Sequence, residues 1–139
     1  MRLWHKDLIK VLPRNQLLGQ WQECCMIARA IAQNDSPNHI LVNPIMDYPI
    51  QHFIDYASLV RNEMVHRGYS CNWEKFSEWL SGVPYQISIS KESYMSMFSD
   101  WHNGRYYDQC YYNLQEKYDR GGITLAEWMK IEKLRSPKG

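Results

Sequence analysis

The sequence lacks any apolar run long enough to cross a membrane, and its first residues, Met1 to Lys6, lack the hydrophobic segment of a signal peptide. It also lacks an excess of charge of either sign, because 16 basic and 15 acidic residues leave a net charge of +1. Such a balance neither requires nor excludes a nucleic-acid partner, since binding depends on a local patch. We therefore predict a soluble, cytoplasmic protein that has no membrane partner.

Two motifs that would indicate a metal site are also missing. Without a CxxC pair, the four cysteines are predicted to be reduced, buried thiols: Cys24, Cys25, Cys71 and Cys110. Without an HExxH motif, the five histidines are predicted to make ordinary hydrogen bonds: His5, His39, His52, His66 and His102. His52 and Asp55 lie three residues apart, so they are the pair that could share a metal ion.

No repeat or low-complexity segment interrupts the 139 residues, and only Ser136 to Gly139 is typical of a frayed tail. This length predicts a single domain, residues 1–139, that can bury a core without metals or disulfides. Aromatic residues are abundant, with six Trp, ten Tyr and three Phe. They can form a core, but many have polar neighbours, where stacking on nucleic-acid bases is an alternative.

Helical periodicity predicts the fold class. Three main helices are expected at Arg14 to Gln33, at Tyr48 to Arg67, and within Ser90 to Asp119, where Asn103-Gly104 interrupts the pattern. A short helix is expected at Trp73 to Leu80, and another opens at the capping box that begins with Thr124. These elements predict an all-α protein.

The segments between these helices give further predictions. Residues 1–13 form a predicted N-terminal arm, which Pro13 separates from the first helix. His39 to Asn43 is predicted to be an extended connection and not a sheet strand. Gly68 is expected to end the second helix in the left-handed conformation that glycine favours.

The first helix carries a single acid, Glu23, away from an apolar stripe formed by Leu17, Trp21, Cys24, Ala28 and Ile31. At roughly 100° per residue, Glu23 lies about 150° from the centre of this stripe. It shares its side with Gln16 and Gln20, so it faces either water or a groove.

Paired tyrosines mark the third main helix. Tyr107 and Tyr111 fall at helical spacing on its apolar stripe and are predicted to be in the core. Tyr106 and Tyr112 point elsewhere, where they would pack between helices or stack on an unpaired base.

The opening MRLWHKDLI, followed by LLGQWQEC, is similar to the phage endonuclease V type of pyrimidine-dimer DNA glycosylase and its bacterial relatives. Further matches are HFIDYASLVRNEMVHRGYSCN and WHNGRYYDQCYYNLQEKYDRGG. The resemblance implies a compact helical fold in which the N-terminal arm threads between helices. It also implies a DNA glycosylase with β-lyase activity on a damaged or modified pyrimidine. We expect a monomer that binds damaged or modified duplex DNA and needs no cofactor or metal.

The resemblance implies that the α-amine of Met1 is the nucleophile and that Glu23 is the acid–base group. An α-amine has an ordinary pKa of about 7.7–8.0, so part of it is neutral and nucleophilic near pH 7. The amine attacks the sugar C1′ and forms an imine, while the carboxylate transfers protons during strand cleavage. The phage enzyme loses its initiator methionine and begins with a small residue, whereas the bulky Arg2 predicts that Met1 is kept.

Contacts to the DNA are also implied by the resemblance. Arg2 matches the arginine that follows the family's terminal residue. Gln22 and Met26 occupy positions where the family has arginines that grip phosphate. His5 is expected near Glu23, where it would bond a phosphate or tune the pKa of the acid. Three further cations are predicted from their positions and not from the resemblance: Arg29, one turn beyond Met26, and Arg105 or Lys117 on the third main helix would rebuild a basic wall, the alternative for each being a solvated surface charge. The predicted DNA-binding residues are therefore Arg2, His5, Gln22, Arg29, Arg105 and Lys117.

Two other functions remain open at this point. A non-enzymatic DNA-binding or partner-binding protein on the same scaffold is favoured by Gln22 and Met26, because the paired arginine clamps beside the acid are missing. A metal-dependent hydrolase built on the histidines would require bound metal.

Overall fold

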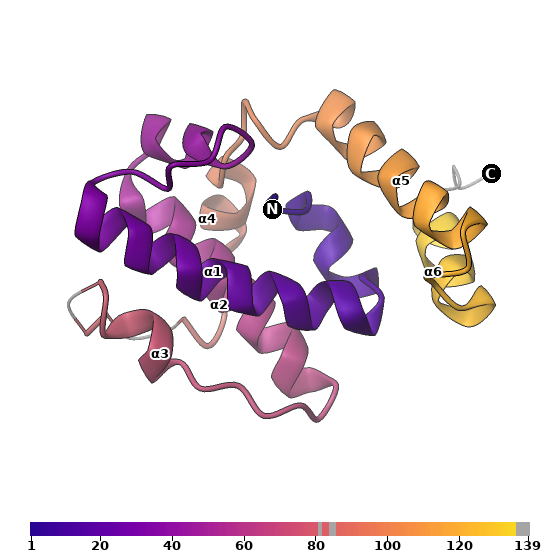
Figure 1. The fold of residues 1–139 in the computed structure, drawn as a ribbon, viewed down its shortest axis with the longest axis horizontal. Coiled ribbons are helices and arrows are strands. Elements are labelled where there is room, and N and C mark those ends of the chain that lie inside the picture. The colour runs from indigo at the N-terminus through magenta and orange to yellow at the C-terminus, as the bar shows by residue number, and fades with distance from the viewer. Residues whose placement is uncertain (81, 84–85, 136–139) are drawn as a thin grey trace.

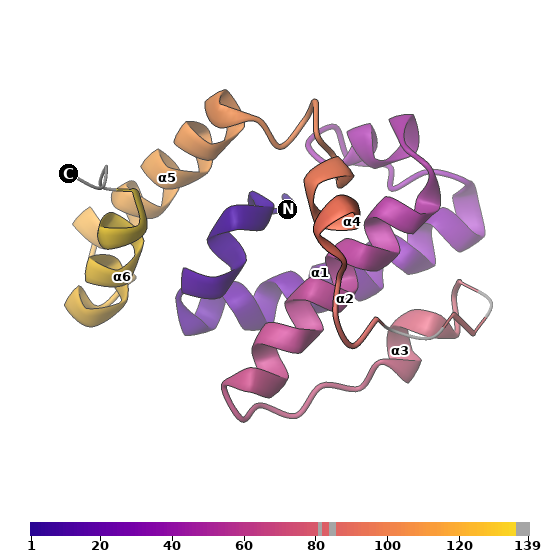
Figure 2. The ribbon, with the colours of Figure 1, turned by 180° about the vertical axis from the view of Figure 1, so that it is seen from behind.

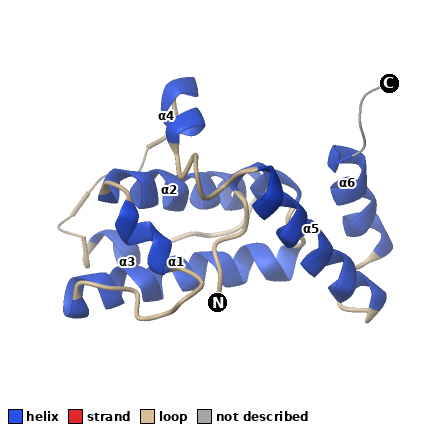
Figure 3. Ribbon diagram, turned by 90° about the horizontal axis from the view of Figure 1, so that it is seen from above, coloured by secondary structure: helices blue, strands red, loops and turns tan. Residues whose placement is uncertain are grey.

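The computed structural model describes residues 1–80, 82–83 and 86–135, and within these ranges it contains helices and no strand (Figures 1 and 3). The three long helices are α1 (Arg14–Asn34), α2 (Ile50–His66) and α5 (Gly104–Asp119). The predicted all-α class is therefore confirmed. The predicted tail, residues 136–139, lies outside the described ranges.

Shorter helices complete the fold: η1 (Lys6–Val11), η2 (Asn43–Asp47), α3 (Glu74–Ser77), α4 (Lys91–Ser96) and α6 (Leu125–Arg135). The helix α3 is shorter than the predicted span of 73–80, because the chain continues beyond it in tighter turns. Within the described ranges, no helix combines the length and the apolar character that crossing a membrane demands.

Local sequence signals set several helix ends as predicted. Pro13 immediately precedes α1, and Gly68 follows α2 with a φ angle of +85°. At the start of α6, the backbone N–H of Thr124 donates to the Glu127 carboxylate at 3.0 Å, and the N–H of Glu127 donates to the Thr124 hydroxyl at 3.1 Å. This reciprocal pair is the predicted capping box.

The predicted extended connection at 39–43 was wrong. The N–H groups of Val42 and Asn43 both donate to the His39 carbonyl, at 3.0 and 2.8 Å, which closes a turn. The Asn43 side chain accepts from the N–H of His39 at 3.0 Å. Asparagine offers the backbone this local alternative to an extended chain, and η2 follows directly.

The break before α5 is longer than predicted, because α4 ends at Ser96 and α5 begins at Gly104. Phe98 lies within this break in the left-handed region, with a φ angle of 49°. Its side chain is fully buried, and its N–H donates to the His52 ring at 3.0 Å. Tertiary packing thus overrides the helical preference of this segment.

The core forms around α2 and the N-terminal arm. Phe53, Tyr56 and Val60 of α2 are fully buried, and so are Leu3 and Leu8 of the arm. The element η1 contacts both α2 and α6, so the N-terminal segment lies between the α1–α2 pair and the α5–α6 pair (Figures 1 and 2). The arm therefore threads between helices, as predicted.

Burial of the cysteines agrees with the prediction for two of the four. All four are free, and Cys24 and Cys110 are buried, whereas Cys25 and Cys71 are half-buried. Desolvation raises the pKa of Cys25 to about 11 and that of Cys71 to about 12, so both remain protonated thiols near pH 7.

Candidate active site

The side chain of Gln20 connects the N-terminal arm to the acid of α1. Its oxygen accepts from the N–H of Trp4 at 2.7 Å, and its nitrogen donates to the Arg2 carbonyl at 2.9 Å. The same nitrogen donates to the Glu23 carboxylate at 3.3 Å. Gln20 is only 1 % exposed, so these bonds are shielded from water. One amide group thus holds the start of the chain and the carboxylate next to each other.

Two tyrosines hold the arm from other helices. The hydroxyl of Tyr56, on α2, donates to the Trp4 carbonyl at 2.5 Å. The hydroxyl of Tyr106, on α5, donates to the Leu3 carbonyl at 2.6 Å. Together with Gln20, these bonds engage the backbone of residues 2, 3 and 4 from three helices. The chain is therefore held up to Arg2, the residue that follows Met1.

Replacing Gln20 with Ala should lower the free energy of unfolding by about 2–4 kcal/mol. The change leaves the buried N–H of Trp4 without a partner and opens a cavity in the arm's contact with α1. Urea unfolding followed by tryptophan fluorescence measures the effect. Gln33→Ala, at an exposed glutamine of α1, is the matched control and should change stability by less than about 0.5 kcal/mol. Equal losses in the two variants would show that Gln20 does not anchor the arm.

His5 lies inside the protein, at 3 % exposure, with both ring nitrogens engaged. Its Nε2 donates to the His102 carbonyl at 2.8 Å, and its Nδ1 accepts from the N–H of Asp7 at 3.0 Å. No ring nitrogen is left for a phosphate, so the geometry does not support the expected contact between His5 and DNA. His5 instead fastens the arm to the segment that precedes α5.

The ring of His102 completes this connection. Its Nδ1 accepts from the N–H of Lys6 at 2.9 Å, and its buried Nε2 has no hydrogen-bond partner. Burial, and then the neighbouring His5 and Lys6, lower the pKa of His102 to about 2. Desolvation also lowers the pKa of His5. Both rings are therefore neutral in the folded protein near pH 7.

Acidification should weaken the protein through these two histidines. An unfolded histidine binds a proton below a pKa of about 6.5, whereas folded His102 stays neutral, so stability is lost as the pH falls below that value. For one such group the loss between pH 7.5 and 5 is about 2 kcal/mol. His102→Asn, which keeps an acceptor for Lys6, should lose less stability over this range when urea unfolding is measured at both pH values. The control His66→Gln, on the exposed end of α2, should match the unmodified protein, and identical pH dependence in His102→Asn would contradict the explanation.

Glu23 is half-buried, and Met1 at the start of the arm is 36 % exposed. Among the described residues, no ion pair joins the Met1 amine to Glu23. Their connection runs through Gln20, which bonds both the Arg2 carbonyl and the Glu23 carboxylate. Met1 is thus accessible at the surface. It is followed by Arg2, whose carbonyl accepts a hydrogen bond from the same Gln20 nitrogen as the Glu23 carboxylate.

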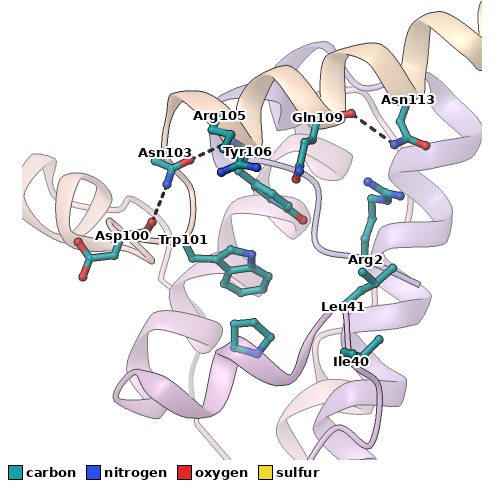
Figure 4. A pocket seen from close by; sticks show the side chains of 11 residues that line it. Arg2, Ile40, Leu41, Asp100, Trp101, Asn103, Arg105, Tyr106, Gln109 and Asn113 are labelled. Atoms are coloured by element: carbon teal, nitrogen blue, oxygen red, sulfur yellow. Dashed lines mark hydrogen bonds between the residues drawn. The ribbon is translucent and has the colours of Figure 1, made fainter.

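A cavity of about 610 Å³ opens beside Arg2, between the 40–44 turn and the start of α5 (Figure 4). Arg105 and Tyr106 line it together with Trp101. A volume of this size accommodates a ligand as large as a nucleotide. The cavity brings together two of the predicted DNA-binding residues, Arg2 and Arg105, with aromatic surface.

The other predicted site residues are more dispersed. Lys117 lines a second cavity, of about 330 Å³, further along α5. Gln22 is exposed on α1 next to Glu23. Arg29 is also exposed on α1, but it lies about 120° around the helix from Glu23 and over the ring of Trp79, 5.7 Å from its centroid. The structure therefore groups Arg2 and Arg105 at one cavity, places Lys117 at the next cavity along α5, and puts Arg29 on a different side of α1 from Glu23.

The histidines are used mainly as hydrogen-bond partners, as expected. His39 accepts from the N–H of Leu41 at 3.2 Å, and His52 accepts from the N–H of Phe98 at 3.0 Å. Asp55, the suggested co-ligand of His52, accepts instead from Gln51 at 2.8 Å. Across the described part of the chain, no group of three or more His, Cys, Asp or Glu side chains is arranged to hold a metal ion.

The tyrosine pairs of α5 divide differently from the prediction. Tyr111 is buried as expected, and Tyr112 is exposed beside Arg135. Tyr107, which was also predicted to be in the core, is only half-buried. Tyr106 packs between elements, one of its two predicted roles, because its hydroxyl donates to the arm and its ring is half-buried. One side of Tyr106 still contributes to the wall of the 610 Å³ cavity.

These features define a class of small all-α proteins in which the N-terminal arm is part of the core and is joined to a helix-borne acid. Residues 1–76, more than half of the 139 residues, match the family model for pyrimidine dimer DNA glycosylase. The chain therefore belongs to the pyrimidine dimer DNA glycosylase family, which places it broadly among enzymes that act on DNA. Neither a curated protein nor a solved structure matches it.

Proposed function

We propose that this protein removes a damaged or modified pyrimidine from DNA and cleaves the strand at the resulting abasic site. The α-amine of Met1 is the nucleophile, and Glu23 is the acid–base group. The observation that carries this proposal is the Gln20 amide, which donates to both the Arg2 carbonyl and the Glu23 carboxylate. This shared donor supports an arrangement in which the terminal residue and the acid act on the same sugar.

The proposed reaction has two stages. The amine nitrogen attacks C1′, the bond from C1′ to the base breaks, and the base leaves with the electron pair and takes up a proton. Loss of a proton from nitrogen and opening of the sugar ring then give an imine. Glu23 accepts a proton from C2′, and the 3′ phosphate leaves by elimination, which cuts the strand. All of these steps use groups of the chain and the DNA.

The position of the amine suits this role. Met1 is accessible to solvent, while the backbone of residues 2 to 4 is held by hydrogen bonds from three helices. A nucleophile whose following residues are held in this way loses less entropy on reaction than one on a flexible terminus. Arg2 lies at the adjacent cavity, where its charge would attract a phosphate.

A second function is favoured by the surface beside Glu23. Gln22 is exposed, and Met26 is 58 % exposed, so neither supplies a cation next to the acid. A DNA-binding protein without catalytic activity would have this surface. It would bind an abasic duplex equally well with Glu23 or Gln at position 23, and it would not cleave.

Borohydride trapping tests the enzymatic proposal. The protein, with Met1 as its free first residue, is incubated with a duplex that contains one abasic site, and borohydride reduces any imine to a stable amine. We expect a covalent protein–DNA adduct, which peptide mass mapping locates on Met1. A duplex with an intact sugar and base at that position is the control. Failure to trap an adduct with the abasic duplex, at protein concentrations that saturate it, would exclude the imine mechanism.

A further inference from the structure

The exposed side of α5 carries a row of polar residues along two neighbouring cavities. We call this row the α5 stripe; its members are Arg105, Gln109, Asn113, Lys117 and Arg120. The first three line the cavity of about 610 Å³, and the last three line that of about 330 Å³. Asn113 lines both cavities, so the two hollows lie next to each other along the helix.

Helix geometry places these side chains on one face. At 100° per residue, the five positions fall within an arc of about 120°. The buried residues Tyr111 and Leu114 lie about 180° and 120° from the centre of this arc, toward the protein. From residue 105 to residue 120 the stripe extends over about 22 Å, which equals roughly six base steps of a DNA strand at 3.4 Å each.

The charges along the stripe suit a polyanion. Together with Arg2, the two cavities are lined by four cations and two carboxylates, those of Asp100 and Glu116. Glu116 forms an exposed ion pair with Arg120 at 2.8 Å, which contributes little to stability and can be exchanged for a phosphate contact. The amide side chains of Gln109 and Asn113 follow Arg105 along α5 and supply neutral donors (Figure 4). Lys117 and Arg120 come after them in the sequence, at the other cationic end.

The stripe also lies next to the proposed active site. Arg2 lines the first cavity opposite α5, and its carbonyl shares the Gln20 donor with Glu23. In contrast, the surface of α1 beside Glu23 offers Gln22 and Met26, which cannot neutralise phosphates. The part of the chain that matches the family ends at residue 76, so α5 belongs to the portion that the match does not describe.

We propose that the α5 stripe binds the phosphate backbone of one DNA strand and leads that strand to the Met1–Glu23 site. This inference rests on the proposed function for its partner, DNA. Arg105 and Arg120 hold phosphates at the two ends of the stripe, and Gln109 and Asn113 bond the backbone between them. The stripe thereby supplies phosphate contacts that α1 lacks beside the acid.

Fluorescence anisotropy with a duplex that carries a stable abasic analogue tests this, because the analogue is bound but not cleaved. The dissociation constant is measured at several salt concentrations for Arg105→Ala, Arg120→Ala and the double variant. Each single change should weaken binding roughly tenfold and reduce the slope of log affinity against log salt by about 0.9. Glu116→Gln, which removes a carboxylate from the same groove, should strengthen binding.

Controls separate this inference from the enzymatic proposal. Lys133→Ala, an exposed lysine of α6 outside both cavities, should leave the slope unchanged, and thermal melting checks that every variant is folded. Unchanged slopes in Arg105→Ala and Arg120→Ala, or no binding of the duplex by the unmodified protein, would overturn the proposed role of the stripe. If the slopes change as expected but borohydride traps no adduct, the stripe binds DNA and the imine mechanism fails.

Discussion

Glu23→Gln should reduce strand cleavage at an abasic site by about 10²- to 10⁴-fold, the range that loss of a positioned acid–base group produces. Glutamine cannot accept the C2′ proton, but it has nearly the same shape. Its side-chain oxygen can still accept the bond from Gln20, which is 3.3 Å long in the protein. The fold should therefore be kept, and single-turnover cleavage of a labelled abasic duplex measures the loss.

Three comparisons make this result specific. Glu74→Gln, an exposed acid on α3, should cleave like the unmodified protein. Duplex binding by Glu23→Gln should stay within about threefold, because Glu23 is not a phosphate ligand. Imine formation should decline less than cleavage, since the amine is untouched. Full cleavage by Glu23→Gln would remove Glu23 from the mechanism.

The fold was predictable where local signals decide it. Pro13 before α1, Gly68 after α2 and the Thr124 capping box each act within one helical turn, so the sequence alone locates these ends. The break before α5 was underestimated because Phe98 takes a left-handed conformation to bury its ring. The backbone conformation of Phe98 depends on neighbours such as His52, which is 46 positions away in the chain.

The candidate site was also predictable only where local spacing decides the arrangement. Periodicity placed Glu23 and Gln20 on one side of α1, and their side chains do touch. Periodicity left open whether this side of the helix faces water or a groove, and the structure shows that Gln20 is buried against the N-terminal arm. No local pattern reports that a separate segment packs on a helix face. Spacing likewise gave no indication that His5 and His102, 97 positions apart, would be buried together.

The role of two tyrosines in holding the arm follows only from their contacts in the folded chain, although spacing had already marked Tyr106 as lying off the apolar stripe. Tyr56 is fully enclosed in α2, yet its hydroxyl donates to the Trp4 carbonyl. Tyr106 does the same for Leu3 from α5. A buried tyrosine needs a partner for its hydroxyl, so a tyrosine within an apolar helix face is a signal for an unpaired backbone carbonyl nearby. In this protein the carbonyls that accept these hydrogen bonds belong to Leu3 and Trp4 of the N-terminal arm.

The largest effect is expected from moving or blocking the α-amine. A protein with two extra residues before Met1 should form no borohydride adduct and should not cleave abasic DNA, although it keeps every side chain. Two added residues displace the amine by up to about 7 Å. The arm cannot slide to compensate, because Gln20, Tyr106 and Tyr56 hold the carbonyls of residues 2, 3 and 4. Acetylation of Met1 should have the same effect by removing the nucleophile without moving it.

The extension and the acetylation together distinguish the need for a free amine from the need for that amine to be in one place. The extended protein retains a free amine, so its inactivity would show that the place of the amine matters and not only its presence. Removing the two residues with a protease that leaves Met1 first should restore both trapping and cleavage. Duplex binding serves as the control and should differ little among the three forms, since the proposed phosphate contacts lie on α5. A fully active extended protein would mean that another amine is the nucleophile; Lys6 is a poor substitute, because its Nζ is buried and donates to the carbonyls of Tyr94 and Met97 at 2.5 and 2.7 Å.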